Sequence, residues 1–159
     1  YFVLQHSDNL VLRTNIYGLN IQDKKSFGEW IYDSLKKDLT IKMFTDIYFS
    51  PILVNELAEL IYLACEKNIA GLYHACGSGC ISKYEFGMEL KKIFNINSGE
   101  ILKSASNCMH FKAPRSKHMG MDNKRLKNTL GVSISTPIES IYKFYHMIEM
   151  REKNECNYR

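Results

Sequence analysis

Two short spacings in this sequence could serve catalysis. Tyr32 and Lys36 form a Tyr-x-x-x-Lys pair, and side chains four residues apart lie on the same face of a helix. A tyrosine and a lysine so placed could support hydride-transfer chemistry. Two residues at helical spacing often coincide by chance, and no cofactor-binding loop precedes this pair. We therefore interpret the pair as part of an ordinary amphipathic helix.

The second candidate is the turn Gly77-Ser-Gly79, which lies between an expected strand and an expected helix. Backbone N–H groups at such a junction can bind phosphate. The turn lacks the third glycine of the G-x-G-x-x-G pattern, so it reads as a flexible connection. P-loop, G-x-S-x-G and H-E-x-x-H motifs are also missing from the sequence. We therefore assign no catalytic residue and no cofactor-binding residue to this chain.

Cysteine usage indicates a reducing compartment. The five cysteines are residues 65, 76, 80, 108 and 156, an odd number that matches no disulfide framework. His74 with Cys76 and Cys80 could join Cys108 and His110 around zinc, but the spacings differ from those of structural zinc sites. We expect free thiols, no metal and a cytoplasmic location.

Length and composition predict one globular domain. The chain has 159 residues, of which 45% are hydrophobic and 24% charged. Its net charge of +4 is too small to indicate a nucleic-acid partner. No apolar run reaches the roughly 18 residues of a membrane helix, so we expect no membrane partner. The chain opens at Tyr1 without an initiator methionine or a secretory pattern, which suggests a piece of a longer protein.

Start signals predict four main helices, near residues 26–37, 51–67, 82–94 and 136–152. Three begin with capping boxes, formed by Ser26 and Glu29, Ser82 and Glu85, and Thr136 and Glu139. Ser50-Pro51 predicts the remaining start. Asp122 can cap a shorter helix that ends at Gly131.

Short apolar runs predict strands at residues 10–13, 40–44 and 72–75, with a possible fourth at 101–103. Strands and helices alternate along the chain, which favours an α/β fold with some parallel pairing. Residues 151–159 are polar, and we expect them to form a tail after the domain at 1–150.

Four segments in order resemble one protein family. They are Val-Leu-Arg-Thr-Asn-Ile-Tyr-Gly at 11–18, Phe-Thr-Asp-Ile-Tyr-Phe-Ser-Pro at 44–51 running into 54–61, Gly-Leu-Tyr-His-Ala-Cys-Gly at 71–77 with 81–86, and the stretch 113–126. The chain resembles the C-terminal portion of an extended short-chain dehydrogenase/reductase. It is most similar to the dTDP-4-dehydrorhamnose reductase family.

The resemblance implies both a fold and an activity. Residues 10–14 and 72–75 would be the last parallel strands of a Rossmann-type sheet, and 40–44 would belong to a small substrate-binding lobe. The parent enzyme would reduce the 4-keto group of a nucleotide-linked deoxysugar with NADPH, in polysaccharide biosynthesis. The missing N-terminal half would bind most of the NADP(H) and supply the catalytic residues. A homodimer is possible.

The same resemblance places four residues beside the nucleotide-diphosphate sugar. Asn15 follows a strand at the edge where open α/β sheets bind ligands, although it could instead cap its own turn. Arg115 could bind diphosphate oxygens bidentately. Asp46 and Tyr48 lie in a loop that the resemblance brings near the ligand.

Two alternatives stay open. The segment Asn15-Ile-Tyr-Gly18 resembles nucleotide-sugar epimerases and dehydratases at least as well as the reductases. Some relatives are non-catalytic, for example the regulatory partner of methionine adenosyltransferase. The sequence upstream of Tyr1 would separate these readings.

Overall fold

The structure is a computed structural model that describes residues 2–21, 24–108, 113 and 116–157. Its helices are α1 (Phe27–Lys36), α2 (Val54–Glu66), α3 (Lys83–Ile93), α4 (Lys124–Leu130) and α5 (Pro137–Asn157), with 3-10 turns at Phe2–Gln5 and Ser106–Cys108. Its strands are β1 (Leu10–Arg13), β2 (Ile16–Tyr17), β3 (Thr40–Phe44), β4 (Tyr48–Phe49), β5 (Ile52–Leu53), β6 (Gly71–His74), β7 (Ile81–Ser82), β8 (Glu100–Ser104) and β9 (His118–Met119).

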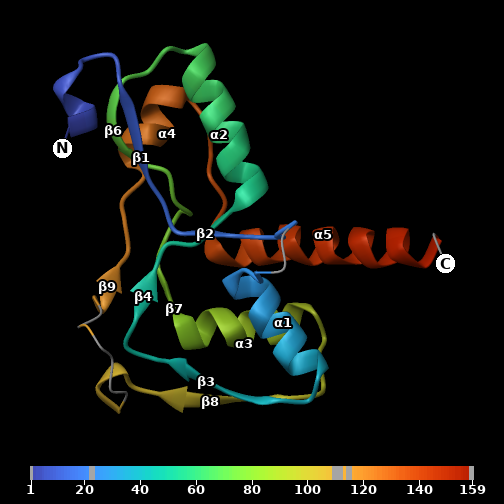
Figure 1. Cartoon of the computed structure of the whole chain (residues 1–159). Coiled ribbons are helices and arrows are strands. Elements are labelled where there is room, and N and C mark those ends of the chain that lie inside the picture. Colours follow the sequence, from blue (N-terminus) through green and yellow to red (C-terminus); the bar gives the residue numbers. More distant parts are fainter. Residues whose placement is uncertain (1, 22–23, 109–112, 114–115, 158–159) are drawn as a thin grey trace.

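One part of the molecule is built on the parallel pair β1 and β6. Leu10 lies opposite Gly71 and Arg13 opposite His74 in this pair. The helices α2 and α4 lie with it at the top of Figure 1. Their apolar side chains form one of two core clusters, which contains Leu57, Leu60, Tyr73, Leu126 and Leu130.

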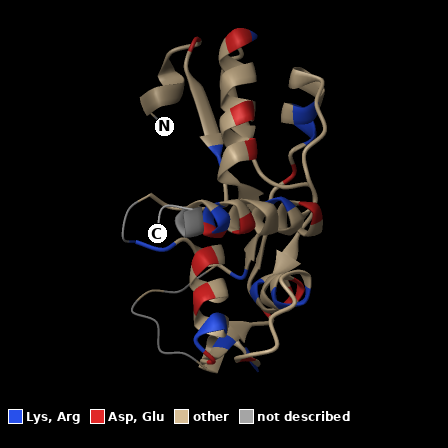
Figure 2. Cartoon of the chain, turned by 90° about the vertical axis from the view of Figure 1, so that its right-hand side faces the viewer, with Lys and Arg blue, Asp and Glu red and all other residues tan. Residues whose placement is uncertain are grey.

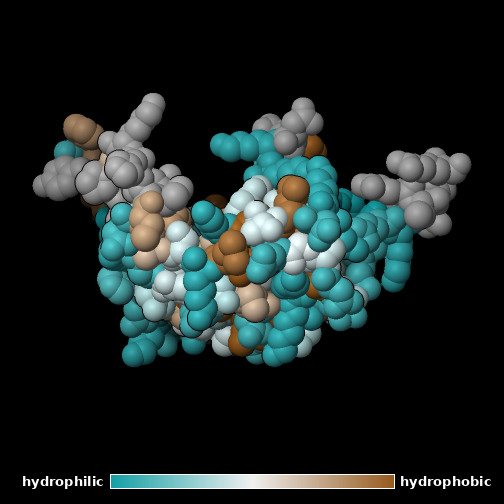
Figure 3. Space-filling view, turned by 90° about the horizontal axis from the view of Figure 1, so that it is seen from below, coloured by the Kyte–Doolittle hydropathy of each residue, from teal (hydrophilic) through white to brown (hydrophobic). Residues whose placement is uncertain are grey.

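The other part is built on the parallel pair β3 and β8, which α1 and α3 cover on one face (Figure 1). Its core cluster includes Tyr17, Phe86 and Phe144. The Tyr17 ring meets both phenylalanine rings edge to face, with centroids 5.1 and 5.5 Å apart. The outward side of β3 and β8 mixes hydrophobic and hydrophilic side chains (Figure 3), and Leu102 there is 37% exposed.

Short strands and a long helix join the two parts. The strand β2 pairs with β5 in parallel, and β4 lies between β7 and β9. The helix α5 crosses the middle of the molecule (Figure 1). The strands β4 and β9 bring residues 48–49 beside 118–119.

The main helix starts agree with the sequence prediction where a capping box marks them. Both hydrogen bonds of the box form at Ser26 and at Ser82, and Thr136 and Glu139 exchange the same bonds at α5. The carboxylate of Asp122 accepts from Lys124 N at 2.8 Å, and α4 ends at Gly131 with φ of 69°.

The predicted helix start at Ser50-Pro51 is wrong. The helix α2 begins at Val54, without a side-chain cap. The Ser50 hydroxyl is fully buried and accepts a hydrogen bond from Met121 N at 3.1 Å, so it serves a tertiary contact. Residues 52–53 form β5 instead of a helical turn.

The helix α5 runs to Asn157, five residues beyond the predicted end. Two contacts hold the residues after position 150. Arg151 pairs with the buried Glu29 at 3.0 Å, and the Tyr32 hydroxyl donates to Glu152 at 2.5 Å. No glycine or proline interrupts the helix there.

Charges of both signs are interspersed over the face in Figure 2, without a continuous basic stripe. Among the described residues, no helix is long and apolar enough to span a bilayer.

Candidate functional site

A cavity of about 400 Å³ opens where α1, β3, α3 and β9 meet, at the base of the β3–β8 part. Its lining consists of Phe27, Phe44, Ile47, Lys83, Ser116 and Met119. Four of these side chains are apolar, one is a hydroxyl and one is cationic. A cavity of this size and composition suits a small organic ligand that carries negative charge.

Lys83, the first residue of α3, is the cationic side chain among the described residues that line the cavity. Its Nζ atom lies 3.3 Å from the ring centroid of Phe49 and 4.0 Å from that of Phe27. Aromatic faces attract an ammonium group at such distances. Burial disfavours the charged form and lowers the pKa of Lys83 to about 8.

Asp46 lies beside the cavity but is held by its own neighbours. Its carboxylate accepts from Ser106 N at 2.8 Å and from Ser106 Oγ at 2.7 Å, and it pairs with Lys117 at 3.1 Å. These bonds, led by that from the Ser106 hydroxyl, lower the pKa of Asp46 to about 2. Asp46 therefore ties the segment after β8 and the segment before β9 to the loop after β3.

Tyr48 is half-buried and flanks the cavity residue Ile47. Its ring stacks on His118, with centroids 5.7 Å apart and planes 7° from parallel. Its backbone N–H donates to Lys117 O at 2.8 Å. Of residues 46–48, Ile47 contributes a side chain to the lining of the cavity, and Asp46 and Tyr48 do not.

Asn15 follows β1, as expected, and is not among the residues that line this cavity. Its Oδ1 accepts from Ser50 N at 3.1 Å, and its backbone carbonyl accepts from Ile52 N at 3.0 Å. Its Nδ2 donates to Thr14 O at 3.3 Å. The amide thus fastens the end of β1 to the loop before β5. Arg115, the fourth predicted residue, lies outside the described residues.

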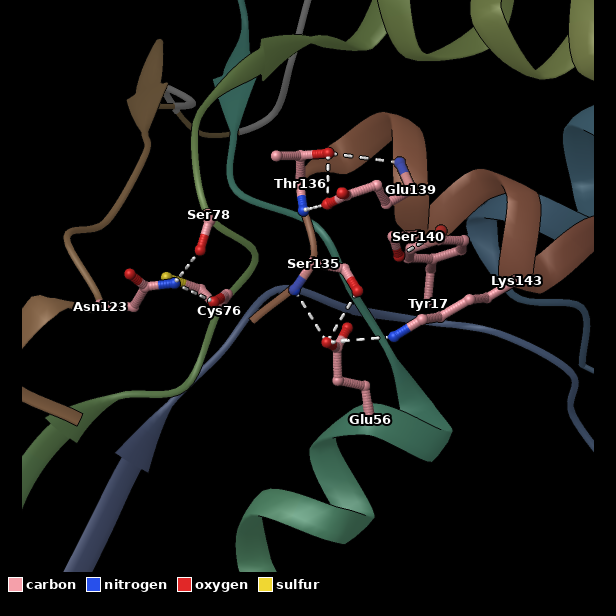
Figure 4. A network of polar contacts seen from close by, with 10 residues as sticks. All are labelled: Tyr17, Glu56, Cys76, Ser78, Asn123, Ser135, Thr136, Glu139, Ser140 and Lys143. Carbon is pink, nitrogen blue, oxygen red and sulfur yellow. Dashed lines mark hydrogen bonds and ion pairs between the residues drawn. The ribbon is translucent and has the colours of Figure 1, made fainter. Parts of the chain in front are cut away.

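A network of polar contacts joins the two parts of the molecule near this loop (Figure 4). Glu56 of α2 accepts from the backbone N–H and the hydroxyl of Ser135, both at 2.8 Å. The Lys143 amine of α5 lies 3.4 Å from the same carboxylate oxygen. One turn earlier in α5, Ser140 Oγ and the Tyr17 hydroxyl are 2.7 Å apart. These contacts fix α5 between α2 and β2.

Neither motif with catalytic potential is placed for catalysis. Tyr32 is 5% exposed, and burial together with its bond to Glu152 raises its pKa well above the ordinary value. In the turn at Gly77 the backbone packs closely on Pro51, since a Cβ at Gly77 would lie 2.1 Å from Pro51 O, and the Ser78 N–H donates to Ser135 O at 2.8 Å.

Among the described residues, no group of His, Cys, Asp or Glu side chains could hold a metal ion. Cys65, Cys76, Cys80 and Cys108 are free thiols. Burial raises the pKa of the Cys76 thiol to about 11, so this thiol is unreactive at neutral pH.

Sequence reasoning named none of the six lining residues as site residues; they are Phe27, Phe44, Ile47, Lys83, Ser116 and Met119. Phe27 and Lys83 each follow a capping serine, so the sequence did place them in the first turn of a helix. Only the tertiary fold brings these two helix starts together with the ends of β3 and β9, and no local pattern encodes that meeting.

The fold identifies the structural class of this chain. The arrangement of parallel strands and helices is that of the C-terminal part of an extended short-chain dehydrogenase/reductase, as the sequence predicted. One similar structure is dTDP-4-dehydrorhamnose reductase from Bacillus anthracis in complex with NADP, with a TM-score of 0.78, 20% identity, and coverage of 87% of this chain and 48% of that one. Another is a hypothetical dTDP-4-dehydrorhamnose reductase from Sulfolobus tokodaii, with a TM-score of 0.69, 26% identity, and coverage of 82% and 45%.

The model of the RmlD substrate binding domain matches residues 2–149, and the chain belongs to this family. A curated relative, the probable low-salt glycan biosynthesis reductase Agl14 of Haloferax volcanii, is 22% identical over 132 residues. That match covers 81% of this chain and 44% of the relative. The chain thus spans about half the length of the proteins it matches.

Proposed function

We propose that this chain is the substrate-binding part of an NADPH-dependent reductase that acts on a nucleotide-linked 4-keto-deoxysugar, as the dTDP-4-dehydrorhamnose reductases do. The observation that carries the proposal is the cavity between α1, β3, α3 and β9, in a chain of the RmlD substrate binding domain family. The cavity offers apolar walls for a base or sugar and an amine for a phosphate. The reductase names of the relatives support the reaction class.

The proposal assigns substrate binding and cofactor binding to two different halves of a longer protein. Residues 1–150 would hold the nucleotide-diphosphate sugar, and the polar residues 151–159 would lie outside this substrate-binding portion. NADP(H) would bind mainly to the half upstream of Tyr1, which would also supply the catalytic tyrosine and lysine. Two features support this division: the coverage of about half of each relative, and the Ser78 N–H of the turn at Gly77, which already donates to Ser135 O.

Four residues of this chain would serve the substrate. Arg115 would bind the diphosphate through its guanidinium, and Asn15 would face the ligand from the end of β1. Asp46 and Tyr48 would hold the loop that carries Ile47 into the cavity. We further propose a cytoplasmic location, because the described cysteines are free thiols, and a possible homodimer.

Titration calorimetry tests the proposal directly. The chain is titrated with dTDP-rhamnose and, separately, with NADPH. We expect the sugar nucleotide to bind and NADPH to give no heat, because the cavity beside Lys83 is present and the Ser78 N–H in the turn at Gly77 already donates to Ser135 O. Binding of NADPH with no response to the sugar nucleotide would refute the proposal.

A further inference from the structure

Lys83 stands in an unusual electrostatic position within the cavity wall. Its amine lies over two phenylalanine rings, and burial lowers its pKa to about 8. The rings attract the positive charge through their quadrupoles, but they accept no conventional hydrogen bond. In the described part of the chain, Lys83 has neither an ion pair with a carboxylate nor a side-chain hydrogen bond.

The charged groups on the neighbouring elements are already engaged with one another. Asp46, after β3, pairs with Lys117 and accepts from Ser106. On α3 itself, Glu85 accepts from Ser82 N at 3.0 Å within the capping box. On α1, Glu29 accepts from Ser26 N and pairs with Arg151. Among the described residues, these carboxylates are thus paired elsewhere, and the ammonium of Lys83 can meet an anionic group that enters the cavity.

A partly desolvated ammonium without a counter-charge favours an anionic ligand over a neutral one. Bringing an anion to it restores the electrostatic stabilisation that water supplied, and a charge-assisted hydrogen bond is about twice as strong as a neutral one. The other lining side chains are apolar apart from Ser116, whose hydroxyl donates to His118 O at 3.2 Å. A neutral base or sugar would pack on these walls, whereas a phosphate would meet the lysine.

We infer that Lys83 is a specificity-determining residue of this cavity, which binds a phosphate group of the ligand through its ammonium. The inference rests on the proposed function, since it assigns the amine to the diphosphate of the nucleotide-linked sugar. It places a second cation at the phosphates besides the proposed Arg115.

The test compares thymidine and dTDP as ligands of the wild-type chain and of Lys83→Met. Methionine keeps the length of the side chain and packs well against aromatic rings, but it lacks the charge. We expect dTDP affinity to fall roughly 10- to 100-fold, the loss typical for one charge-assisted hydrogen bond. Thymidine affinity should stay within about twofold.

Two further variants control for charge and folding. Lys92→Met removes the same charge from an exposed position of the same helix, where Lys92 pairs only loosely with Glu89 at 3.8 Å; it should bind dTDP like the wild type. Lys83→Arg keeps a cation and should retain most of the dTDP affinity. Circular dichroism and thermal melting confirm that each variant is folded.

The outcomes separate the inference from the proposed function. If the wild type binds dTDP and Lys83→Met binds it equally well, the inference fails and the proposed function stands. An equal loss for thymidine and dTDP would also overturn the inference, because Lys83 would then serve the base or the shape of the cavity. If the wild type binds neither dTDP nor dTDP-rhamnose, both fail.

Discussion

The two charged side chains at the cavity have opposite roles. Asp46 is surrounded by donors from Ser106 and Lys117 and holds loops together, whereas Lys83 faces rings and the cavity. The sequence singled out Asp46 and Tyr48, which flank the lining residue Ile47. It could not distinguish a carboxylate that positions a loop from one that contacts a ligand, because both lie in polar segments.

Replacing Asp46 by Asn should destabilise the fold at neutral pH and have less effect in acid. Folding lowers the pKa of Asp46 from 3.8 to about 2. A lowered pKa stabilises the folded state above about pH 4, and this stabilisation is lost as the pH falls towards 2. Urea unfolding at pH 7, 5 and 3 measures the difference from the wild type. Asp8→Asn, at an exposed aspartate, is the control; a difference that stays constant down to pH 3 would contradict the assignment.

Replacing Arg115 by Ala in the full-length enzyme should mainly weaken substrate binding. Losing one bidentate, charge-assisted contact costs about 1.5–3 kcal/mol, which raises the apparent KM roughly 10- to 100-fold. Arg115→Lys keeps the charge but loses the planar guanidinium. Its KM should therefore lie between those of the wild type and Arg115→Ala. Steady-state kinetics decide the matter, and an unchanged KM would make Arg115 an ordinary surface residue.

At the scale of elements, local signals were sufficient where the relevant hydrogen bonds are local. The boxes at Ser26, Ser82 and Thr136 each place both partners within three residues, so sequence alone identified these helix starts. Ser50 failed as a start signal because its hydroxyl binds Met121, 71 residues away. The two-residue strands such as β4 and β9 have no alternating pattern to detect, and they exist only because distant segments meet.

The end of α5 should contribute to stability despite its polar composition. Deleting residues 151–159 removes the Arg151 partner of Glu29, which is 5% exposed, and the Glu152 partner of Tyr32. A buried group that loses its partner costs about 1–3 kcal/mol, so the urea midpoint should fall. Deleting only 154–159 keeps both contacts and should leave the midpoint nearly unchanged. Equal urea midpoints for the two truncations would show that the contacts of Arg151 and Glu152 do not contribute to stability.

At the scale of the whole molecule, β1 is the element that points to a missing neighbour. It pairs in parallel with β6 on one side, and no other described strand pairs with it. Strands of a parallel sheet normally have covered faces and two neighbours. The unpaired edge at Leu10 and Leu12 therefore offers N–H and C=O groups to another strand, since the carbonyls of Asn9 and Arg13 accept hydrogen bonds from the side of β6. A strand of the N-terminal half would pair there in the parent protein.

We accordingly expect this chain alone to associate through β1 and to lack reductase activity. Light scattering should show dimers or larger species. Leu12→Pro removes a backbone donor from that edge and should reduce the association, whereas Leu12→Ala, which keeps the donor, should not. Assays with NADPH and a 4-keto sugar nucleotide should show no turnover until the separately expressed N-terminal half is added. A strictly monomeric chain would refute the argument from the edge, and turnover by the chain alone would refute its reading as a substrate-binding part.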